Sequence, residues 1–148
     1  MWRYTLTRQW DPDKPSILFI GLNPSTGTEK EDDPTIRRCL NFAKSWGYGT
    51  YVMCNMFGFR STDPSILTNL ADPNGPDNDH WIRIEAEKAS AVVVAWGCHK
   101  MTHSRADRVL SLIQNPLCLG TTHNGSPRHP LYVLGSRQPE PYVKSSDC

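Results

Sequence analysis

The segment Ile17–Thr26, which reads ILFIGLNPST, constrains the fold of this chain more than any other stretch. It begins as an apolar run typical of a buried strand and stops at a polar turn. Strands that end in such turns are where α/β proteins place their ligands. Gly21 permits close backbone approach, and Asn23 offers an amide that both donates and accepts. A purely structural turn after a core strand is an equally weighted alternative.

Length and composition favour one ordinary domain. The 148 residues suit a single hydrophobic core, and a net charge of +1 argues against tight, nonspecific binding to duplex nucleic acid. The five cysteines form no Cys-x-x-Cys pair, which favours a reduced cytosolic environment. No apolar run approaches the about 20 residues of a membrane helix, and no signal-peptide profile is present. We therefore expect a cytoplasmic protein without a membrane partner.

Strand and helix signals alternate along the chain, which predicts an α/β domain with a mainly parallel sheet. Asp33 and Pro34 are expected to open a helix as N-cap and first helical residue, and Gly47 to end it. Further helices are predicted over His80–Ser90 and Thr102–Gln114. The predicted strands are an edge strand around Arg3–Trp10, then Ile17–Leu22, Thr50–Asn55, Ala91–Trp96 and Leu117–Gly120.

Three segments lack a regular pattern. Gly58–Asp79 reads as a long loop, and such loops inside compact domains work as lids or binding surfaces. Within it, Ile66, Leu67 and Leu70 allow one helical turn. Residues 121–130 read as a polar loop. We place the domain at residues 1–134 and expect residues 135–148 to form a loose tail.

Polar or small residues follow each main strand: Asn23, Asn55, Trp96 with Gly97, and the late loop that contains Asn124 and His129. Such residues are expected to converge on a ligand cleft at one edge of the sheet. Two amides, the ring of Phe57 and an imidazole suit a flat heterocycle, because amides read its hydrogen-bonding edge and a ring stacks on its face. Core packing is an equally weighted alternative for Phe57.

The order of these motifs resembles the uracil-DNA glycosylase superfamily. The matching segments are GLNPS (Gly21–Ser25), CNMF (Cys54–Phe57), VVVAWG (Val92–Gly97) and HPLY (His129–Tyr132). The first is similar to the loop of the mismatch-specific branch, in which Asn replaces the Asp of other branches. The resemblance implies a three-layer α/β/α sandwich with a mainly parallel central sheet.

The same resemblance assigns roles to particular residues. Asn23 would position a water for attack on the glycosidic carbon, and His129 would support the negative charge of the departing base. Asn55 would read the base edge, and Phe57 would stack on the base. The complete set of expected substrate-binding residues is Gly21, Leu22, Pro24, Ser25, Thr26, Arg37, Arg38, Asn55, Phe57, Trp96, Gly97 and Asn124.

The whole run from about Arg3 to about Val133 more closely resembles an uncharacterised bacterial and phage family of the DUF1643 type. Its pattern here is LNPST, DPTIRRC (Asp33–Cys39), GYG, N-x-F, TDP, GP-x-N (Gly75–Asn78) and AWG. Two departures from the glycosylase pattern bear on activity. No carboxylate occupies position 23, and the late loop lacks both a hydroxyl directly after His-Pro and a leucine-rich wedge. The second departure argues against flipping a base out of duplex DNA.

Several residues have competing interpretations. Arg37 and Arg38 lie near the start of a helix, where a phosphate site and solvated surface charge are comparably weighted. His99 and His103 have the i, i+4 spacing of a metal pair, but no third ligand follows at fixed spacing. We therefore predict neither a metal nor another cofactor. Asp33 reads as a helix cap in preference to a catalytic carboxylate.

Three classes of function remain open at this point. The chain is expected to recognise a nucleobase in a nucleotide or in single-stranded or modified DNA, with hydrolysis of an N-glycosidic bond as its chemistry. The second class is a pocket that captures a nucleotide signal without turning it over. The third is a glycosylase-like scaffold that binds a protein.

Overall fold

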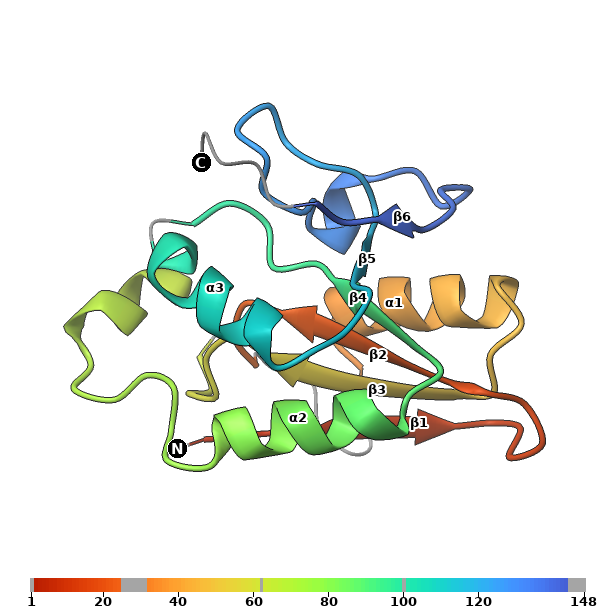
Figure 1. Cartoon of the computed structure of the whole chain (residues 1–148), viewed down its shortest axis with the longest axis horizontal. Helices are drawn as coiled ribbons and strands as arrows, with labels where there is room; N and C mark the ends of the chain where they lie inside the picture. The colour runs from red at the N-terminus through yellow and green to blue at the C-terminus, as the bar shows by residue number, and fades with distance from the viewer. Residues whose placement is uncertain (1, 25–31, 62, 100, 144–148) are drawn as a thin grey trace.

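The computed structural model of the chain describes residues 2–24, 32–61, 63–99 and 101–143 (Figure 1). One sheet has the strand order β1-β3-β2-β4-β5-β6. The strands are β1 (Leu6–Gln9), β2 (Ser16–Gly21), β3 (Thr50–Asn55), β4 (Ala91–Val94), β5 (Leu117–Cys118) and β6 (Glu140–Pro141). The α-helices are α1 (Pro34–Ser45), α2 (Asn78–Lys88) and α3 (Thr102–Ser111), and the short 3₁₀ helices are η1 (Pro64–Asn69) and η2 (Pro130–Tyr132).

The sheet is mixed, so the expectation of a mainly parallel sheet is not confirmed. Strands β3, β2, β4 and β5 run parallel, whereas β1 and β6 pair antiparallel with their neighbours. The arrowheads of β2 and β3 point opposite to that of β1 in Figure 1. A parallel neighbour needs a crossover, usually through a helix, and no α-helix stands between β5 and β6 in the chain. The broader prediction of an α/β fold is confirmed.

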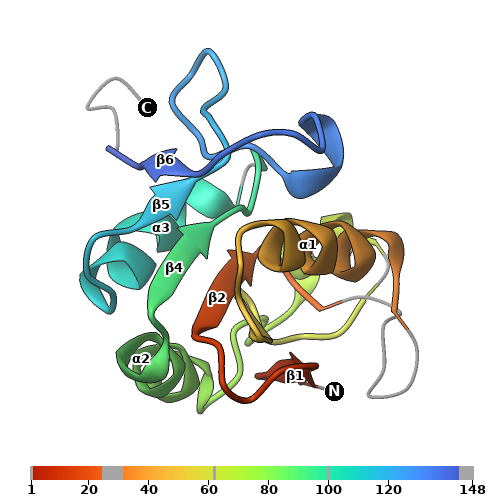
Figure 2. The same ribbon diagram turned by 90° about the vertical axis from the view of Figure 1, so that its right-hand side faces the viewer.

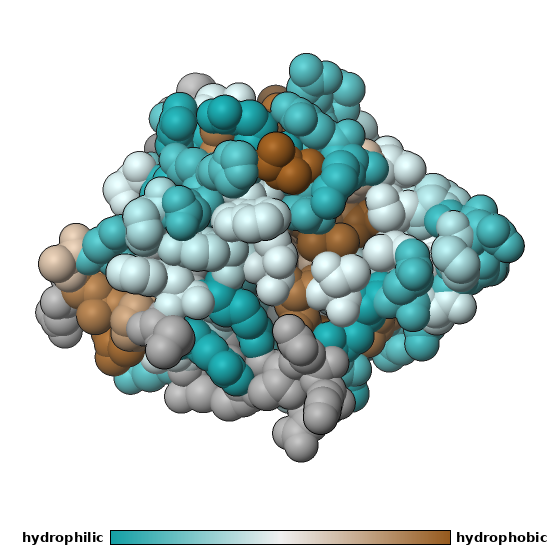
Figure 3. Space-filling model, turned by 90° about the horizontal axis from the view of Figure 1, so that it is seen from below, coloured by the Kyte–Doolittle hydropathy of each residue, from teal (hydrophilic) through white to brown (hydrophobic). Residues whose placement is uncertain are grey.

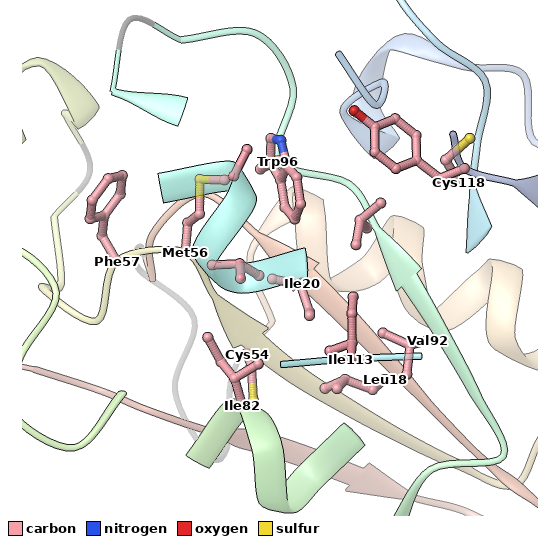
Figure 4. Packing of buried hydrophobic residues seen from close by; sticks show 14 of the residues in the cluster. Leu18, Ile20, Cys54, Met56, Phe57, Ile82, Val92, Trp96, Ile113 and Cys118 are labelled. Atoms are coloured by element: carbon pink, nitrogen blue, oxygen red, sulfur yellow. The ribbon is translucent and has the colours of Figure 1, made fainter. Parts of the chain in front are cut away.

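Both faces of the central strands are covered. Ile17 and Phe19 of β2 belong to a cluster with residues of α1, whereas Leu18 and Ile20 face the opposite way, toward α2 and α3. Figure 2 shows α1 on one side of the sheet and α2 on the other. Figure 4 shows the second cluster from close by, with Ile20, Cys54 and Ile82 pointing into it. A strand buried on both faces reads as a continuous apolar run, which is the pattern of Ile17–Ile20.

Local signals placed most elements correctly. The predicted strand Thr50–Asn55 is β3, and the Asp33 side chain caps α1 by accepting from the backbone N–H of Ile36 at 2.8 Å. Asp33 is buried, and its role as the helix cap is confirmed. Strand β4 is shorter than predicted, because it ends at Val94 and leaves Trp96 beyond the ladder.

The C-terminal segment differs from the predicted loose tail as far as residue 143. Strand β6 pairs with β5, and Tyr142 is buried with its hydroxyl donating to the carbonyl of Gly125 at 3.0 Å. Trp46 Nε1 donates to the carbonyl of Arg137 at 3.3 Å. The Pro, Ser and charged residues of this stretch predict a loose end, but the buried ring of Tyr142 packs it against the domain. Residues 144–148 lie outside the described part.

The surface around α2 and β1 is mainly hydrophilic. Seen from below, it shows teal and white residues with smaller, separate brown areas (Figure 3). Within the described ranges, no helix is long and apolar enough to cross a bilayer.

Candidate functional site

The carboxyl ends of β2, β3 and β4 open into a pocket of about 450 Å³. This is the size range of small-molecule sites. The sequence predicts convergence of polar strand ends, and the structure brings these residues together. The expected residues that line the pocket are Gly21, Leu22, Asn23, Pro24, Asn55, Trp96, Gly97 and His129.

Asn55 forms part of the pocket wall at the end of β3. Only 4% of the residue is exposed, and its Oδ1 atom is buried without a hydrogen-bond partner among the described residues. A side chain at Gly21 would place its Cβ 2.8 Å from that oxygen, so glycine is what lets the Asn55 amide lie against β2. A buried, unpaired polar atom costs about 1–3 kcal/mol. In a pocket wall, such an atom points to a ligand that satisfies it.

Asn23 is oriented by backbone carbonyls. Its Nδ2 donates to the carbonyls of Pro24 at 3.1 Å, Phe59 at 3.3 Å and Ser61 at 3.0 Å. The amide nitrogen is therefore held by protein, which leaves Oδ1 as the acceptor for a ligand or a water. Because a carboxylate has no donor for these carbonyls, the structure explains why an amide stands here.

His129 lines the pocket, and one of its ring nitrogens is engaged by the backbone. Its Nδ1 accepts from the backbone N–H of Leu131 at 3.2 Å at the start of η2, which places the proton of the neutral ring on Nε2. Burial lowers the pKa of His129 below its ordinary value, against an opposing effect of Asp33. Gly97 has a φ of +73°, and a Cβ there would lie 3.3 Å from that of His129. The glycine thus permits both the turn and this close approach.

The depressed pKa of His129 has a testable consequence for stability. The unfolded histidine takes up a proton near its ordinary pKa of 6.5, whereas the folded one resists protonation. Its contribution to stability is therefore complete above pH 6.5 and is lost as the pH falls through the folded pKa. We expect urea denaturation to show a steeper acid loss of stability in the wild type than in His129→Gln. The exposed His103, replaced in the same way, serves as the control, and equal slopes for the wild type and His129→Gln would contradict the assignment.

The sequence did not single out several lining residues. Arg3, Thr35, Ser61 and Cys98 reach the pocket, together with His99, which the sequence suggested only as a member of a metal pair. Thr35 lies within the DPTIRRC motif, and Ser61 directly precedes the TDP motif, which is the signal that could have found them. Arg3 has no such local signal, because it reaches the pocket through long-range pairing of its backbone N–H with the carbonyl of Gly58 at 2.8 Å.

Other expected residues do not line the pocket. Phe57 is buried in the core, and the Arg105 guanidinium lies 5.9 Å from the centre of its ring. Figure 4 shows the Phe57 ring away from Trp96. Arg38 donates to the carbonyls of Pro130 at 3.2 Å and Val133 at 2.6 Å, which ties α1 to η2. Arg37 donates to the carbonyl of Asp32 at 2.8 Å, and Asn124 donates to Cys98 Sγ at 3.2 Å. Ser25 and Thr26 lie outside the described residues.

The chain around Asn55 is braced from α2 and α3. Asn78, from the GP-x-N motif, is fully buried, and its Nδ2 donates to the carbonyls of Asn55 at 2.9 Å and Met56 at 3.1 Å. Arg105 donates to the same Met56 carbonyl through Nε at 3.0 Å and Nη2 at 2.8 Å. Arg105 also pairs with Asp79 at 2.8 Å. Burial raises the pKa of Asp79, but hydrogen bonds from Arg105 and Arg108 outweigh this and lower it.

This brace predicts a large effect of Asn78→Ala on stability. Removing the amide leaves the buried Asn55 carbonyl without its donor, which costs about 1–3 kcal/mol of unfolding free energy. Urea denaturation would measure the loss. The exposed Asn41 on α1, replaced by alanine, is the matched control and should change stability little. An Asn78→Ala protein as stable as this control would show that the brace is dispensable.

Comparison with known proteins adds a family and no activity. A family model described as "Protein of unknown function (DUF1643)" matches residues 3–131, nearly all of the described domain. Neither the curated proteins nor the solved structures contain a match to the chain.

Proposed function

The chain belongs to the DUF1643 family of proteins of unknown function, and we propose that it recognises a nucleobase in the pocket at the ends of β2, β3 and β4. The ligand is a nucleotide or a modified or single-stranded DNA. The observation that carries this proposal is the buried Asn55 carboxamide, whose Oδ1 has no partner within the described structure. An amide offers adjacent donor and acceptor groups, which match the alternating edge of a base.

The chemistry proposed for the pocket is hydrolysis of an N-glycosidic bond. Asn23 Oδ1 accepts a hydrogen bond from a water and orients it toward the anomeric carbon. The water oxygen bonds to that carbon while the carbon–nitrogen bond breaks, and the base leaves with the bonding electrons. His129 Nε2–H donates to the base as its negative charge develops. The water proton ends on the departing base or in solvent.

The uracil-DNA glycosylase-like architecture is part of the same proposal. It is supported by the order of the motifs along the chain and by helices on both faces of the sheet. A bacterial or phage origin is proposed from the resemblance alone. The exposed Leu131 and Tyr132 of the HPLY segment line the pocket and provide an apolar rim.

A second candidate function is capture of a nucleotide without turnover. The observation that favours it is the amide at position 23, because a carboxylate there would activate water more strongly. Asn23 is an amide, and Asp33, the one carboxylate among the described pocket-lining residues, accepts the cap hydrogen bond of α1. Such a pocket recognises a base with the same amides but activates water poorly.

The test is mass spectrometry of the filtrate after incubation with nucleosides, nucleotides, cyclic dinucleotides and base-modified oligonucleotides. Free base in the filtrate, formed much more slowly with the Asn23→Ala variant, would establish a glycosidase and identify its substrate. Depletion of one compound without product would establish capture. An unchanged panel would overturn both forms of the proposal for these ligands and direct attention to protein partners.

A further inference from the structure

We propose that the pocket wall formed by Arg3, Thr35 and Ser61 is a phosphate subsite for the nucleotide whose base Asn55 recognises. This inference rests on the proposed function and deepens it, because it names a phosphorylated ligand in place of a free base or nucleoside. It also moves the phosphate site away from Arg37 and Arg38, where the sequence suggested one.

Arg3 and Ser61 are held on adjacent segments. The backbone N–H of Arg3 donates to the carbonyl of Gly58 at 2.8 Å, and Trp2 forms an isolated bridge with Phe59. The backbone N–H of Ser61 donates to the carbonyl of Pro24 at 2.8 Å, which brings residues 58–61 against the turn after β2. Arg3 and Ser61 both line the pocket. The Ser61 hydroxyl donates to the carbonyl of Asp63 at 3.1 Å, so the Arg3 guanidinium is the principal anion-binding group from these two segments.

The start of α1 completes the wall. Thr35 lies in the first turn of this helix and lines the pocket, which adds a second hydroxyl near the positive end of the helix dipole. Asp33 uses its side chain to cap Ile36 and also lines the pocket, so it offsets part of the positive charge. The wall therefore combines the Asp33 carboxylate with the Arg3 guanidinium and the Thr35 hydroxyl at the start of α1.

Arg3 keeps its positive charge beside the Asp33 carboxylate. Arg3 is half-buried, and its pKa is lowered by burial and by the nearby Arg60 and raised by Asp33. A guanidinium remains charged at neutral pH under such conditions. A half-buried guanidinium that lines a pocket favours an anionic ligand there, and a phosphate carries about −1.5 to −2 charges.

Arg37 and Arg38, which the sequence suggests for a phosphate, have other structural roles. Arg38 is bound to the carbonyls of Pro130 and Val133, and neither Arg37 nor Arg38 lines the pocket. Arg3, by contrast, shares the pocket with Asn55 and His129. A ligand that reaches both sets of groups must carry a base and an anion, and a nucleotide has both.

The test compares matched ligands by isothermal titration calorimetry. The probes are the common nucleosides, their 5′- and 3′-monophosphates, and short single-stranded oligonucleotides that contain the same base. We expect one monophosphate to bind at least about 10-fold more tightly than its nucleoside, as a charged hydrogen bond can provide. Arg3→Gln should remove that difference and leave nucleoside binding within a few-fold. Arg83→Gln, on the exposed face of α2, is the matched control and should change neither affinity.

The outcomes separate this subsite from the base site. Equal wild-type affinities for nucleoside and monophosphate would overturn the subsite and leave base recognition intact. Failure of every probe to bind the wild type would overturn the proposed function itself. If Arg3→Gln does not fold, inorganic phosphate provides the second measurement: it should compete with the monophosphate and not with the nucleoside, and failure to compete would overturn the subsite. Preference for the monophosphate over the oligonucleotide assigns the phosphate to a free nucleotide, and the reverse assigns it to a strand.

Discussion

Replacing Asn55 with alanine is expected to weaken binding of the nucleobase ligand about 10- to 100-fold. The amide would contribute two hydrogen bonds in a pocket wall, and each is worth about 0.5–1.5 kcal/mol. Their sum converts to one or two orders of magnitude in affinity. Isothermal titration calorimetry with the compound found in the filtrate experiment measures the loss.

The fold should survive this substitution, because the Asn55 side chain has an unpartnered buried Oδ1 and no hydrogen bond is lost there. Thermal denaturation of the ligand-free protein checks that expectation. Asn41→Ala, an exposed amide on α1, is the matched control for affinity. Unchanged ligand affinity in a folded Asn55→Ala protein would show that the pocket does not read a base through this residue.

The second large effect is expected at Asn23. If the pocket hydrolyses a glycosidic bond, Asn23→Ala should lower turnover by about 100-fold or more, the scale of a lost group that prepares a proton transfer. The ligand should still bind within a few-fold, because Asn55 and His129 remain. Single-turnover kinetics and calorimetry separate the two quantities. If the pocket only captures a ligand, the same substitution weakens affinity, and no turnover is measured in either protein.

The aspartate variant tests the orientation of Asn23. Three carbonyls face its Nδ2 at 3.0–3.3 Å, and a carboxylate would place an acceptor against them. Asn23→Asp is therefore expected to be less stable than Asn23→Ala in urea denaturation, although a carboxylate is the stronger base toward water. A stable and faster Asn23→Asp protein would contradict the proposed orientation of this amide.

Local sequence patterns predicted an element correctly where the residues that stabilise it lie within the same segment. Asp33 and Pro34 predict the start of α1, because the side-chain cap of Asp33 and the fixed φ of Pro34 both act within one helical turn. Thr50–Asn55 reads as a strand because its residues are buried on both sides of the sheet. The clustering of Asn23, Asn55, Gly97 and His129 also followed from the sequence, since parallel strands deliver their carboxyl ends to one edge.

Other features depend on partners that are distant in the chain. Phe57 and Asn55 are two residues apart, yet one lies in the core and the other lines the pocket. Strand β6 is held in place by Tyr142, which is buried and donates to the carbonyl of Gly125. No pattern in the sequence near Tyr142 predicts this contact. The segment predicted as a long loop, Gly58–Asp79, contains η1, and near its end Asn78, the first residue of α2, donates to the carbonyl of Asn55 at the end of β3.

The sequence by itself determined the α/β class, the cap of α1, and which strand ends supply the amides and the imidazole of the pocket. The tertiary structure alone decided that Arg3 reaches this pocket, that Arg38 ties α1 to η2, and that Asn23 presents its oxygen. The physical reason is the separation along the chain over which each interaction acts. Propensity and periodicity act over a few residues, whereas a hydrogen bond between Arg3 and Gly58 exists only after the chain has brought the two segments together.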